Sequence, residues 1–196
     1  MKDRILGLLL FLLFLPLMAM LALVSLFCIG RRCIFHSTRL GLRRKPFEIF
    51  KYTTMAQWTQ RQFEEYLEQH PECKAQWQRQ HKLFNDPRCS RWGYFLRRSS
   101  LDELPQLLNV IRGDMALVGP RPITAEEEHK YGHRAQRLFS VKPGITGLWQ
   151  VSGRNLITYR RRIAMDIYYT RHRSFSLDLW ILCKTFRAVI CGKGAF

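Results

Sequence analysis

The stretch Ser99–Pro122 reads SSLDELPQLLNVIRGDMALVGPRP and combines adjacent acids, a periodic apolar run and an arginine between two prolines. The apolar positions follow the i, i+3, i+4, i+7 spacing of one helix face: Leu104, Leu107, Leu108 and Ile111. Gly113 stands where this predicted helix would end. Pro120 and Pro122 restrict the backbone on both sides of Arg121, so we expect this arginine on a stiff loop.

The adjacent acids of this stretch fit two different roles. Ser100 and Glu103 match the S-x-x-E capping box, in which acids only stabilise the first helical turn. That placement puts Pro105 inside the helix, where proline is costly. With Asp102 as N-cap, Pro105 falls in the first turn, where it is tolerated. The two carboxylates, the backbone N–H groups and Arg121 could then handle a phosphate and a divalent cation.

The composition indicates one domain with a strong need for anionic partners. The chain has 196 residues, enough for one domain and an anchor but too few for two full domains. Its 32 Lys and Arg against 15 Asp and Glu give a net charge of +17. Such an excess indicates nucleic acid, an anionic membrane surface or phosphorylated substrates as partners. The sequence has no helix-turn-helix, zinc or RNA-binding motif, so we expect no nucleic-acid partner.

Residues 5–29 contain no charged side chain, and as a straight helix they would extend about 37 Å, enough for a hydrocarbon core of about 30 Å. The run is too long for a signal peptide, and no small-x-small cleavage site follows, so we expect a retained membrane anchor at residues 1–30. More basic residues follow the run than precede it, which places residues 31–196 on the cytoplasmic side. Cysteines there should be free thiols, and no C-x-x-C pair occurs.

The path of the anchor through the membrane stays open at this point. Pro16 lies near its middle, and both flanks are basic, which suits a kinked helix that enters and leaves by the same leaflet. Spanning helices also tolerate proline, so a spanning anchor fits these residues equally well.

The segment after the anchor predicts a small hairpin followed by helices. Residues 33–36 and 47–52 are expected to form two strands around the basic turn 42–45. Lys51 lies at the end of the second strand, where it could face a phosphate. Residues 58–84 form a predicted helical insertion of mixed charge.

The C-terminal half alternates helices with a glycine-rich loop. Helices are expected at residues 125–139 and 158–171. Between them, Lys142–Arg154 is a glycine-punctuated loop in which the backbone could closely approach an anion or a nucleotide. Residues 176–190 form an amphipathic segment that suits either the bilayer interface or the core. Asp178 is an isolated acid near the start of this segment.

Four segments together resemble the bacterial sugar transferases, the small monotopic phosphoglycosyltransferases that transfer a sugar-1-phosphate to polyprenyl phosphate. The matching segments are Gly41 and Lys45-Pro46-Phe47 with Lys51-Tyr52, Leu96–Gln106, Val118–Pro122, and Lys142–Gly147 through Gln150–Arg154. The insertion at 58–84 is similar to that of the hexose-1-phosphate branch. The resemblance implies an α+β, mainly helical fold with a re-entrant membrane helix, a short β-hairpin and a membrane-associated catalytic domain with interfacial amphipathic helices.

In that family the Asp of the Asp-Glu pair attacks a UDP-sugar, expels UMP and carries the phosphosugar until polyprenyl phosphate accepts it. The resemblance implies Asp102 as this nucleophile and Glu103 as a Mg²⁺ ligand, with Asp178 near the metal. Arg121 and Arg154 would contact phosphate or nucleotide. The other implied substrate-binding residues are Lys51, Pro120, Pro122 and Gln150.

From this resemblance we expect transfer of galactose- or glucose-1-phosphate from a UDP-sugar to undecaprenyl phosphate, the first membrane step of bacterial exopolysaccharide, capsule or O-antigen synthesis. The expected location is the cytoplasmic face of the bacterial inner membrane, in contact with membrane lipids. Whether the protein forms a homodimer stays open.

Three positions depart from the family pattern. Leu15 stands before the proline of the anchor where members usually have Ser. Thr53-Thr54 replaces an Arg, and His36-Ser37-Thr38 replaces a Gln. These departures leave open an inactive family member, and the net charge of +17 leaves open a basic membrane-tethered binding module.

Overall fold

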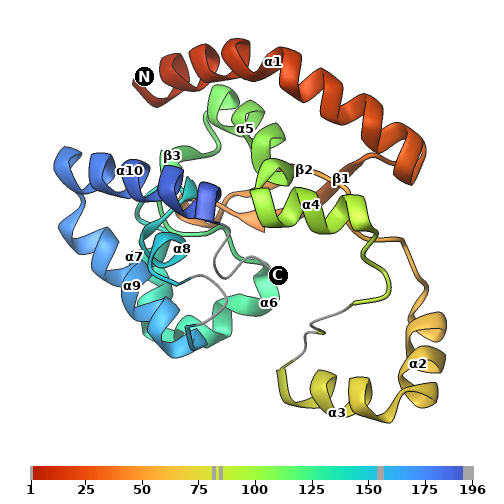
Figure 1. Cartoon of the computed structure of the whole chain (residues 1–196). Coiled ribbons are helices and arrows are strands. Elements are labelled where there is room, and N and C mark those ends of the chain that lie inside the picture. Colours follow the sequence, from red (N-terminus) through yellow and green to blue (C-terminus); the bar gives the residue numbers. More distant parts are fainter. Residues whose placement is uncertain (1, 81–82, 84–85, 154–156, 192–196) are drawn as a thin grey trace.

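The computed structural model describes residues 2–80, 83, 86–153 and 157–191, which form a mainly helical α+β fold with a long apolar helix along one side (Figure 1). The elements are α1 (Lys2–Ile29), β1 (Ile34–Leu40), η1 (Leu42–Arg44), β2 (Pro46–Tyr52), α2 (Gln60–Gln69), α3 (Pro71–Gln80), α4 (Arg91–Ser99), η2 (Leu101–Gln106), α5 (Leu107–Arg112), β3 (Ala116–Val118), α6 (Ala125–Glu128), η3 (His129–Arg134), α7 (Ala135–Leu138), β4 (Gly144–Thr146), α8 (Leu148–Val151), α9 (Tyr159–His172) and α10 (Phe175–Cys191). The predicted mainly helical α+β fold with a long N-terminal apolar helix and a β-hairpin is confirmed.

Helix α1 contacts the rest of the chain along almost its whole length. Near its start, the Arg4 guanidinium Nε donates to the carbonyl of Ile111 over 2.7 Å. Near its end, the indole Nε1 of Trp92 donates to the Ser25 hydroxyl over 2.9 Å. These two contacts are separated by about 32 Å of helix. The face of α1 turned away from these contacts is apolar and exposed: Leu9, Leu12, Leu13, Met20, Leu23 and Phe27.

The buried face of α1 packs on α5 and on β2. A Cβ at Gly7 would lie 2.8 Å from Val110 Cγ1, so the small residue lets α1 approach α5 closely. Further along, the Tyr52 hydroxyl donates to the carbonyl of Met18 over 2.7 Å. A long apolar helix thus lies directly against the helix that follows Asp102.

Strands β1 and β2 form the predicted antiparallel hairpin, with His36 opposite Phe50 in the register. Asn109 of α5 fixes this hairpin to the central stretch from a fully buried position. Its side-chain amide donates to the carbonyl of Glu48 over 2.6 Å and accepts from the Phe50 N–H over 3.3 Å. The end of β2 is thereby held beside η2.

Neither predicted cap forms at the start of the central stretch. Ser100 has a left-handed backbone (φ 57°, ψ 18°) and its side chain makes no cap bond. Asp102, Glu103 and Pro105 lie in a 3₁₀ helix, and the regular α-helix begins only at Leu107. Both N-cap predictions are therefore wrong, because the carboxylate of Glu103 binds a residue of β2 instead of the local backbone.

A second, parallel strand pair joins β3 to β4 and corrects the prediction of an irregular glycine loop at 142–154. Gly119 and Gly144 face each other so closely that a Cβ on Gly144 would collide with the Gly119 backbone nitrogen. The two glycines thus allow the backbones of the two segments to pass very close to each other. Helix α8 follows directly after β4. The predicted continuous helix at 125–139 is also wrong, because Gly132 breaks it with φ 52° and ψ −135°.

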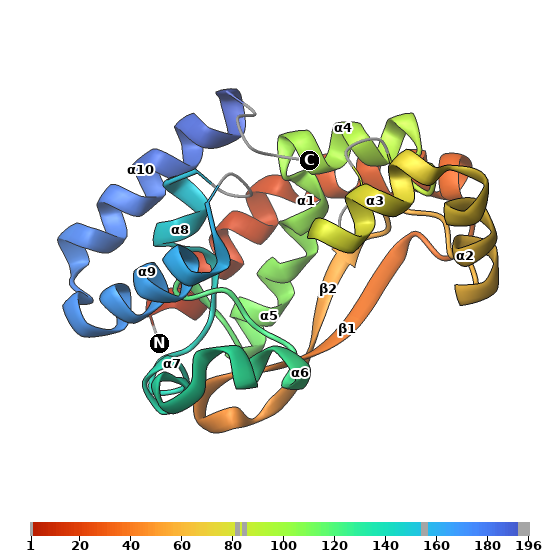
Figure 2. The ribbon, with the colours of Figure 1, turned by 90° about the horizontal axis from the view of Figure 1, so that it is seen from below.

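The remaining helical predictions are confirmed. Helices α2 and α3 occupy the predicted insertion and stand out from the rest of the chain (Figures 1 and 2). Helix α10 contributes to the core through Ile181, which is fully buried, and it exposes Phe175 and Phe186. Its place in the bilayer interface stays a prediction. The cysteines whose side chains the structure describes are free: Cys28, Cys33, Cys73, Cys89 and Cys183.

Candidate active site

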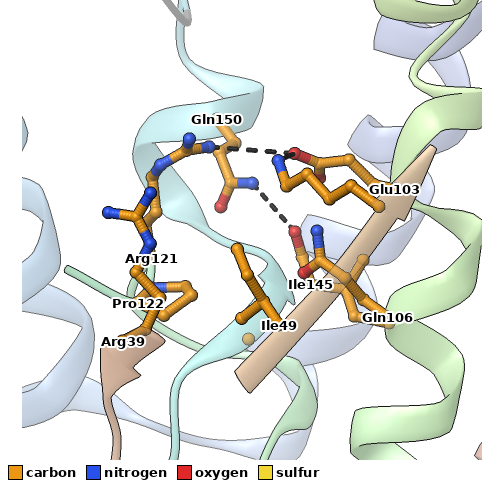
Figure 3. Close-up of a pocket in the computed structure, with 10 residues that line it drawn as sticks. Arg39, Ile49, Glu103, Gln106, Arg121, Pro122, Ile145 and Gln150 are labelled. Carbon is orange, nitrogen blue, oxygen red and sulfur yellow. Dashed lines mark hydrogen bonds and ion pairs between the residues drawn. The ribbon is translucent and has the colours of Figure 1, made fainter. Parts of the chain in front are cut away.

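A pocket opens where the hairpin, η2, the loop after β3 and the β4–α8 segment meet (Figure 3). Its lining residues come from segments far apart in the sequence: Arg39, Ile49, Lys51, Glu103, Gln106, Arg121, Pro122, Gly144, Ile145 and Gln150. Five of the predicted site residues are among them: Lys51, Glu103, Arg121, Pro122 and Gln150. The fold therefore assembles candidates that the sequence offered separately.

The carboxylate of Glu103 lies between two cations of this pocket. Its Oε1 is 2.6 Å from Lys51 Nζ and 3.8 Å from Arg121 Nη1. The side chains of Lys51 and Glu103 are 16% and 20% exposed, so solvent reaches the pair only in part. Cations held in this way suit the oxygens of a phosphate, which Arg and Lys bind with charge-assisted hydrogen bonds.

Asp102 precedes Glu103 but does not itself line the pocket. Burial and the adjacent charge of Glu103 raise the pKa of Asp102 to about 6, although Lys51, Arg97 and Arg121 oppose this rise. With a pKa of about 6, the carboxylate is mostly ionised at pH 7 yet more basic than an ordinary one. Such a group is suited to attack an electrophilic phosphorus.

Backbone hydrogen bonds clamp the loop that carries Arg121. The Gly119 N–H donates to the carbonyl of Thr146 over 2.9 Å, and the Gly144 N–H donates to that of Pro120 over 2.9 Å. On the other side, the Leu40 N–H donates to the carbonyl of Ile123 over 2.9 Å. The predicted stiff loop is therefore anchored to β4 and to β1. Pro120 serves this clamp and is not one of the lining residues.

Next to the loop lies a charged cluster that the sequence did not reveal, formed by Arg39, Glu127, Tyr131, Arg162 and Asp166. Arg39 and Arg162 approach the carboxylate of Glu127 to 3.8 and 3.9 Å. Asp166, 1% exposed, accepts from the Tyr131 hydroxyl over 2.9 Å and lies 3.9 Å from Arg162 Nε. Burial raises the pKa of Asp166 to about 7, against the opposing charge of Arg162.

The sequence carries little signal for this cluster, because its members are far apart along the chain. Arg39 is a strand residue, Tyr131 lies in a helix broken by glycine, and Asp166 lies in a basic helix. A single acid within that basic helix was the one visible hint. Burial lowers the pKa of Arg39, and the nearby charge of Arg121 lowers it further.

One predicted residue, Asp178, lies away from the lining of the pocket, and another, Arg154, is not described. Asp178 accepts a hydrogen bond from the Tyr169 hydroxyl over 2.7 Å and is not among the residues that line the pocket with Glu103. Arg154 lies outside the residues that the structure describes.

The donor set of the pocket fits Mg²⁺ in the form that this ion usually takes with phosphorylated substrates. Within the described ranges, no group of three or more His, Cys, Asp or Glu side chains could form a complete metal cage. Mg²⁺ commonly needs only one or two carboxylates, with waters and substrate phosphates supplying its other ligands. Glu103 on the pocket wall, with Asp102 beside it, meets this requirement.

The chain matches the family model of the bacterial sugar transferases over residues 1–192. It is 42% identical over 167 residues to the undecaprenyl-phosphate galactose phosphotransferase of Salmonella typhimurium, covering 85% of this chain and 35% of that protein. It is 37% identical over 202 residues to the UDP-glucose:undecaprenyl-phosphate glucose-1-phosphate transferase of Caulobacter vibrioides, covering 99% and 70%.

Identity to the exopolysaccharide production protein ExoY of Rhizobium meliloti is 40% over 185 residues, covering 94% of this chain and 82% of that protein. An uncharacterized sugar transferase of Haemophilus influenzae is 43% identical over 167 residues. The chain spans about a third of the length of the Haemophilus and Salmonella relatives.

Proposed function

Because the chain belongs to the bacterial sugar transferase family, we propose that it transfers a sugar-1-phosphate from a UDP-sugar to undecaprenyl phosphate and releases UMP. Relatives named for galactose and for glucose transfer support a hexose donor, UDP-galactose or UDP-glucose. A relative named for exopolysaccharide production supports a role at the start of bacterial surface-glycan synthesis.

One observation carries this proposal: the Asp102–Glu103 pair, with Lys51 and Arg121 beside it, lies next to a helix built for the membrane. Helix α5 directly continues η2, and α1 packs on α5. With α1 in the membrane, the carboxylates would lie close to the level at which a membrane-embedded acceptor presents its phosphate. A soluble donor would approach from the pocket side, where Lys51 and Arg121 line the wall.

In the proposed reaction, an oxygen of Asp102 attacks the β-phosphorus of the UDP-sugar. The bond from this phosphorus to the bridging oxygen breaks, and UMP leaves with that oxygen. A phosphate oxygen of undecaprenyl phosphate then attacks the same phosphorus and releases the Asp102 carboxylate. Two steps of this kind suit a soluble donor and a lipid acceptor, which need not be bound together.

Lys51 and Arg121 would bind the diphosphate oxygens and so release Glu103 from its ion pairs. Glu103, with Asp102, would hold Mg²⁺, which supplies charge neutralisation of the diphosphate when bound. The clamped Pro-Arg-Pro loop would keep the Arg121 side chain oriented during transfer.

The anchor is proposed to stay on one side of the membrane. A spanning helix would leave the cytoplasmic body within its first turns, whereas α1 contacts the body from Arg4 to Ser25. A membrane-embedded helix packed in this way returns to the cytoplasmic surface. An N-terminal epitope tag should then be cut by protease in inverted vesicles and protected in spheroplasts; the reverse result would establish a spanning anchor.

The test of the reaction is UMP release by the full-length protein in detergent with Mg²⁺, undecaprenyl phosphate and a panel of UDP-sugars. We expect release with UDP-galactose or UDP-glucose and its loss in Asp102→Asn, because an amide cannot act as this nucleophile. Full activity of Asp102→Asn would overturn the mechanism. No release with any donor from folded protein would favour an inactive family member.

A further inference from the structure

A second cavity of about 270 Å³ lies on the side of β3 near the start of α1, and it shares no lining residue with the candidate active site. Its lining residues are Asp3, Leu42, Ala116, Val118, Ser140, Val141, Lys142, Tyr169 and Arg173. The volume is many times the roughly 30 Å³ that one water molecule takes in the liquid. The proposed transfer reaction assigns no role to this space.

The charge of the cavity is complementary to a phosphodiester. Lys142 and Arg173 contribute two positive charges and Asp3 one negative charge, so the lining has a net charge of +1. The Arg4 and Lys142 side chains both approach Gly113, where a Cβ would lie 3.6 Å from Arg4 Cδ and from Lys142 Nζ. Cations therefore gather at this end of α1.

The surroundings of the cavity match the level of lipid headgroups. Asp3 is followed on α1 by Ile5 and Leu6, which are 55% and 44% exposed. Arg173 is followed by Phe175 at the start of α10, which is 83% exposed. The charged residues of the cavity therefore lie next to exposed apolar side chains on α1 and α10. A ligand with a charged headgroup and apolar chains could contact both.

We propose that this cavity binds the phosphate of an anionic phospholipid, with Lys142 and Arg173 on the phosphate and the acyl chains along α1 and α10. The bound lipid would fix the start of the anchor against β3 and α9. This site is separate from that of the polyprenyl acceptor, which must reach Asp102.

The test measures thermal unfolding of the full-length protein in detergent with added dioleoylphosphatidylglycerol, dioleoylphosphatidylcholine or inorganic phosphate. We expect phosphatidylglycerol to raise the unfolding temperature by about 3–6 °C, and phosphatidylcholine and inorganic phosphate to have much smaller effects. Equal stabilisation by inorganic phosphate would show a site for free phosphate and overturn the lipid assignment. Equal stabilisation by phosphatidylcholine would overturn the need for an anionic headgroup.

Two kinds of variant locate the effect. Lys142→Gln/Arg173→Gln should lose the stabilisation by phosphatidylglycerol, whereas Lys74→Gln/Arg134→Gln, which removes equal charge from exposed positions on α3 and η3, should keep it. Ser140→Trp fills the cavity from an exposed position without altering its charges and should also lose it. Full stabilisation of the double variant or of Ser140→Trp would overturn the proposal.

Discussion

Asp102 is a partly buried carboxylate and Asp166 a fully buried one, and burial raises their pKa values to about 6 and about 7. Asp102 lies on a 3₁₀ turn beside the pocket, next to Glu103, which lines it. Asp166 lies on α9 with 1% of its surface exposed, where the Tyr131 hydroxyl binds it. Burial therefore raises the pKa both of a carboxylate beside a pocket and of one that is enclosed by the protein.

The difference shows that a raised pKa does not by itself identify a reacting group. Structural carboxylates inside charged clusters show the same shift as catalytic ones. What separates these two is exposure, because Asp102 is partly exposed and adjoins Glu103, which lines the pocket, whereas Asp166 is 1% exposed. The sealed carboxylate has a different use: it balances the charges of Arg162 and Arg121 beneath the Pro-Arg-Pro loop.

The largest expected effect is a difference between Asp102→Asn and Asp166→Asn in covalent labelling of the protein. When the protein is incubated with a UDP-hexose labelled in the sugar, without acceptor lipid, the wild type should retain label on the protein after denaturation. Asp102→Asn should lose this label by on the order of 10³-fold or more, whereas Asp166→Asn should keep it within about tenfold. If Asp166→Asn alone lost the label, the assigned roles would have to be exchanged.

An intermediate effect concerns stability and pH. Because the folded state raises the pKa of Asp166 from 3.8 to about 7, it binds the proton more tightly than the unfolded state does. The contribution of this group is therefore fully present at low pH and is lost as the pH rises through 7. Between pH 5 and 8 the loss should be about 3 kcal/mol.

Chemical unfolding in detergent at these two pH values checks this expectation. Relative to wild type, Asp166→Asn should become more stable as the pH rises, because the amide has no charge to bury. Asp114→Asn, just after the end of α5, controls for the loss of one acid. An unchanged difference between Asp166→Asn and wild type at both pH values would show that Asp166 is not a titrating buried acid.

The sequence predicted those elements that have a local pattern, but it did not predict the parallel strand pair. The hairpin, α9 and α10 follow from alternation or helical periodicity within one segment. Strands β3 and β4 have three residues each, too few for any period, and they pair across a long separation along the chain. In the central stretch, a tertiary ion pair with Lys51 overrides the local capping pattern of Glu103.

The residues of the candidate site also differ in how far the sequence could predict them. Lys51, Glu103 and Arg121 were each recognisable within their own short motifs, and the fold brings them together. The partners Tyr131 and Asp166 are 35 positions apart, and neither belongs to a motif, so only the packing of α9 on η3 reveals them. Asp178 is a different case, since its expected place near the metal rests on the resemblance alone, and the hydrogen bond that it accepts from Tyr169 leaves this a prediction.

The smallest expected effect tests the single hydrogen bond within the sealed cluster. Tyr131→Phe removes the donor that lies 2.9 Å from Asp166 Oδ2 and should cost about 1–2 kcal/mol of unfolding free energy. This bond favours the charged carboxylate, so the cost should be larger at pH 8 than at pH 5. Tyr168→Phe, on the exposed side of α9, is the matched control and should change little at either pH. Because Tyr131 touches neither the pocket nor Asp102, UMP release should persist; a loss of release as large as that in Asp102→Asn would show that the sealed cluster takes part in the chemistry.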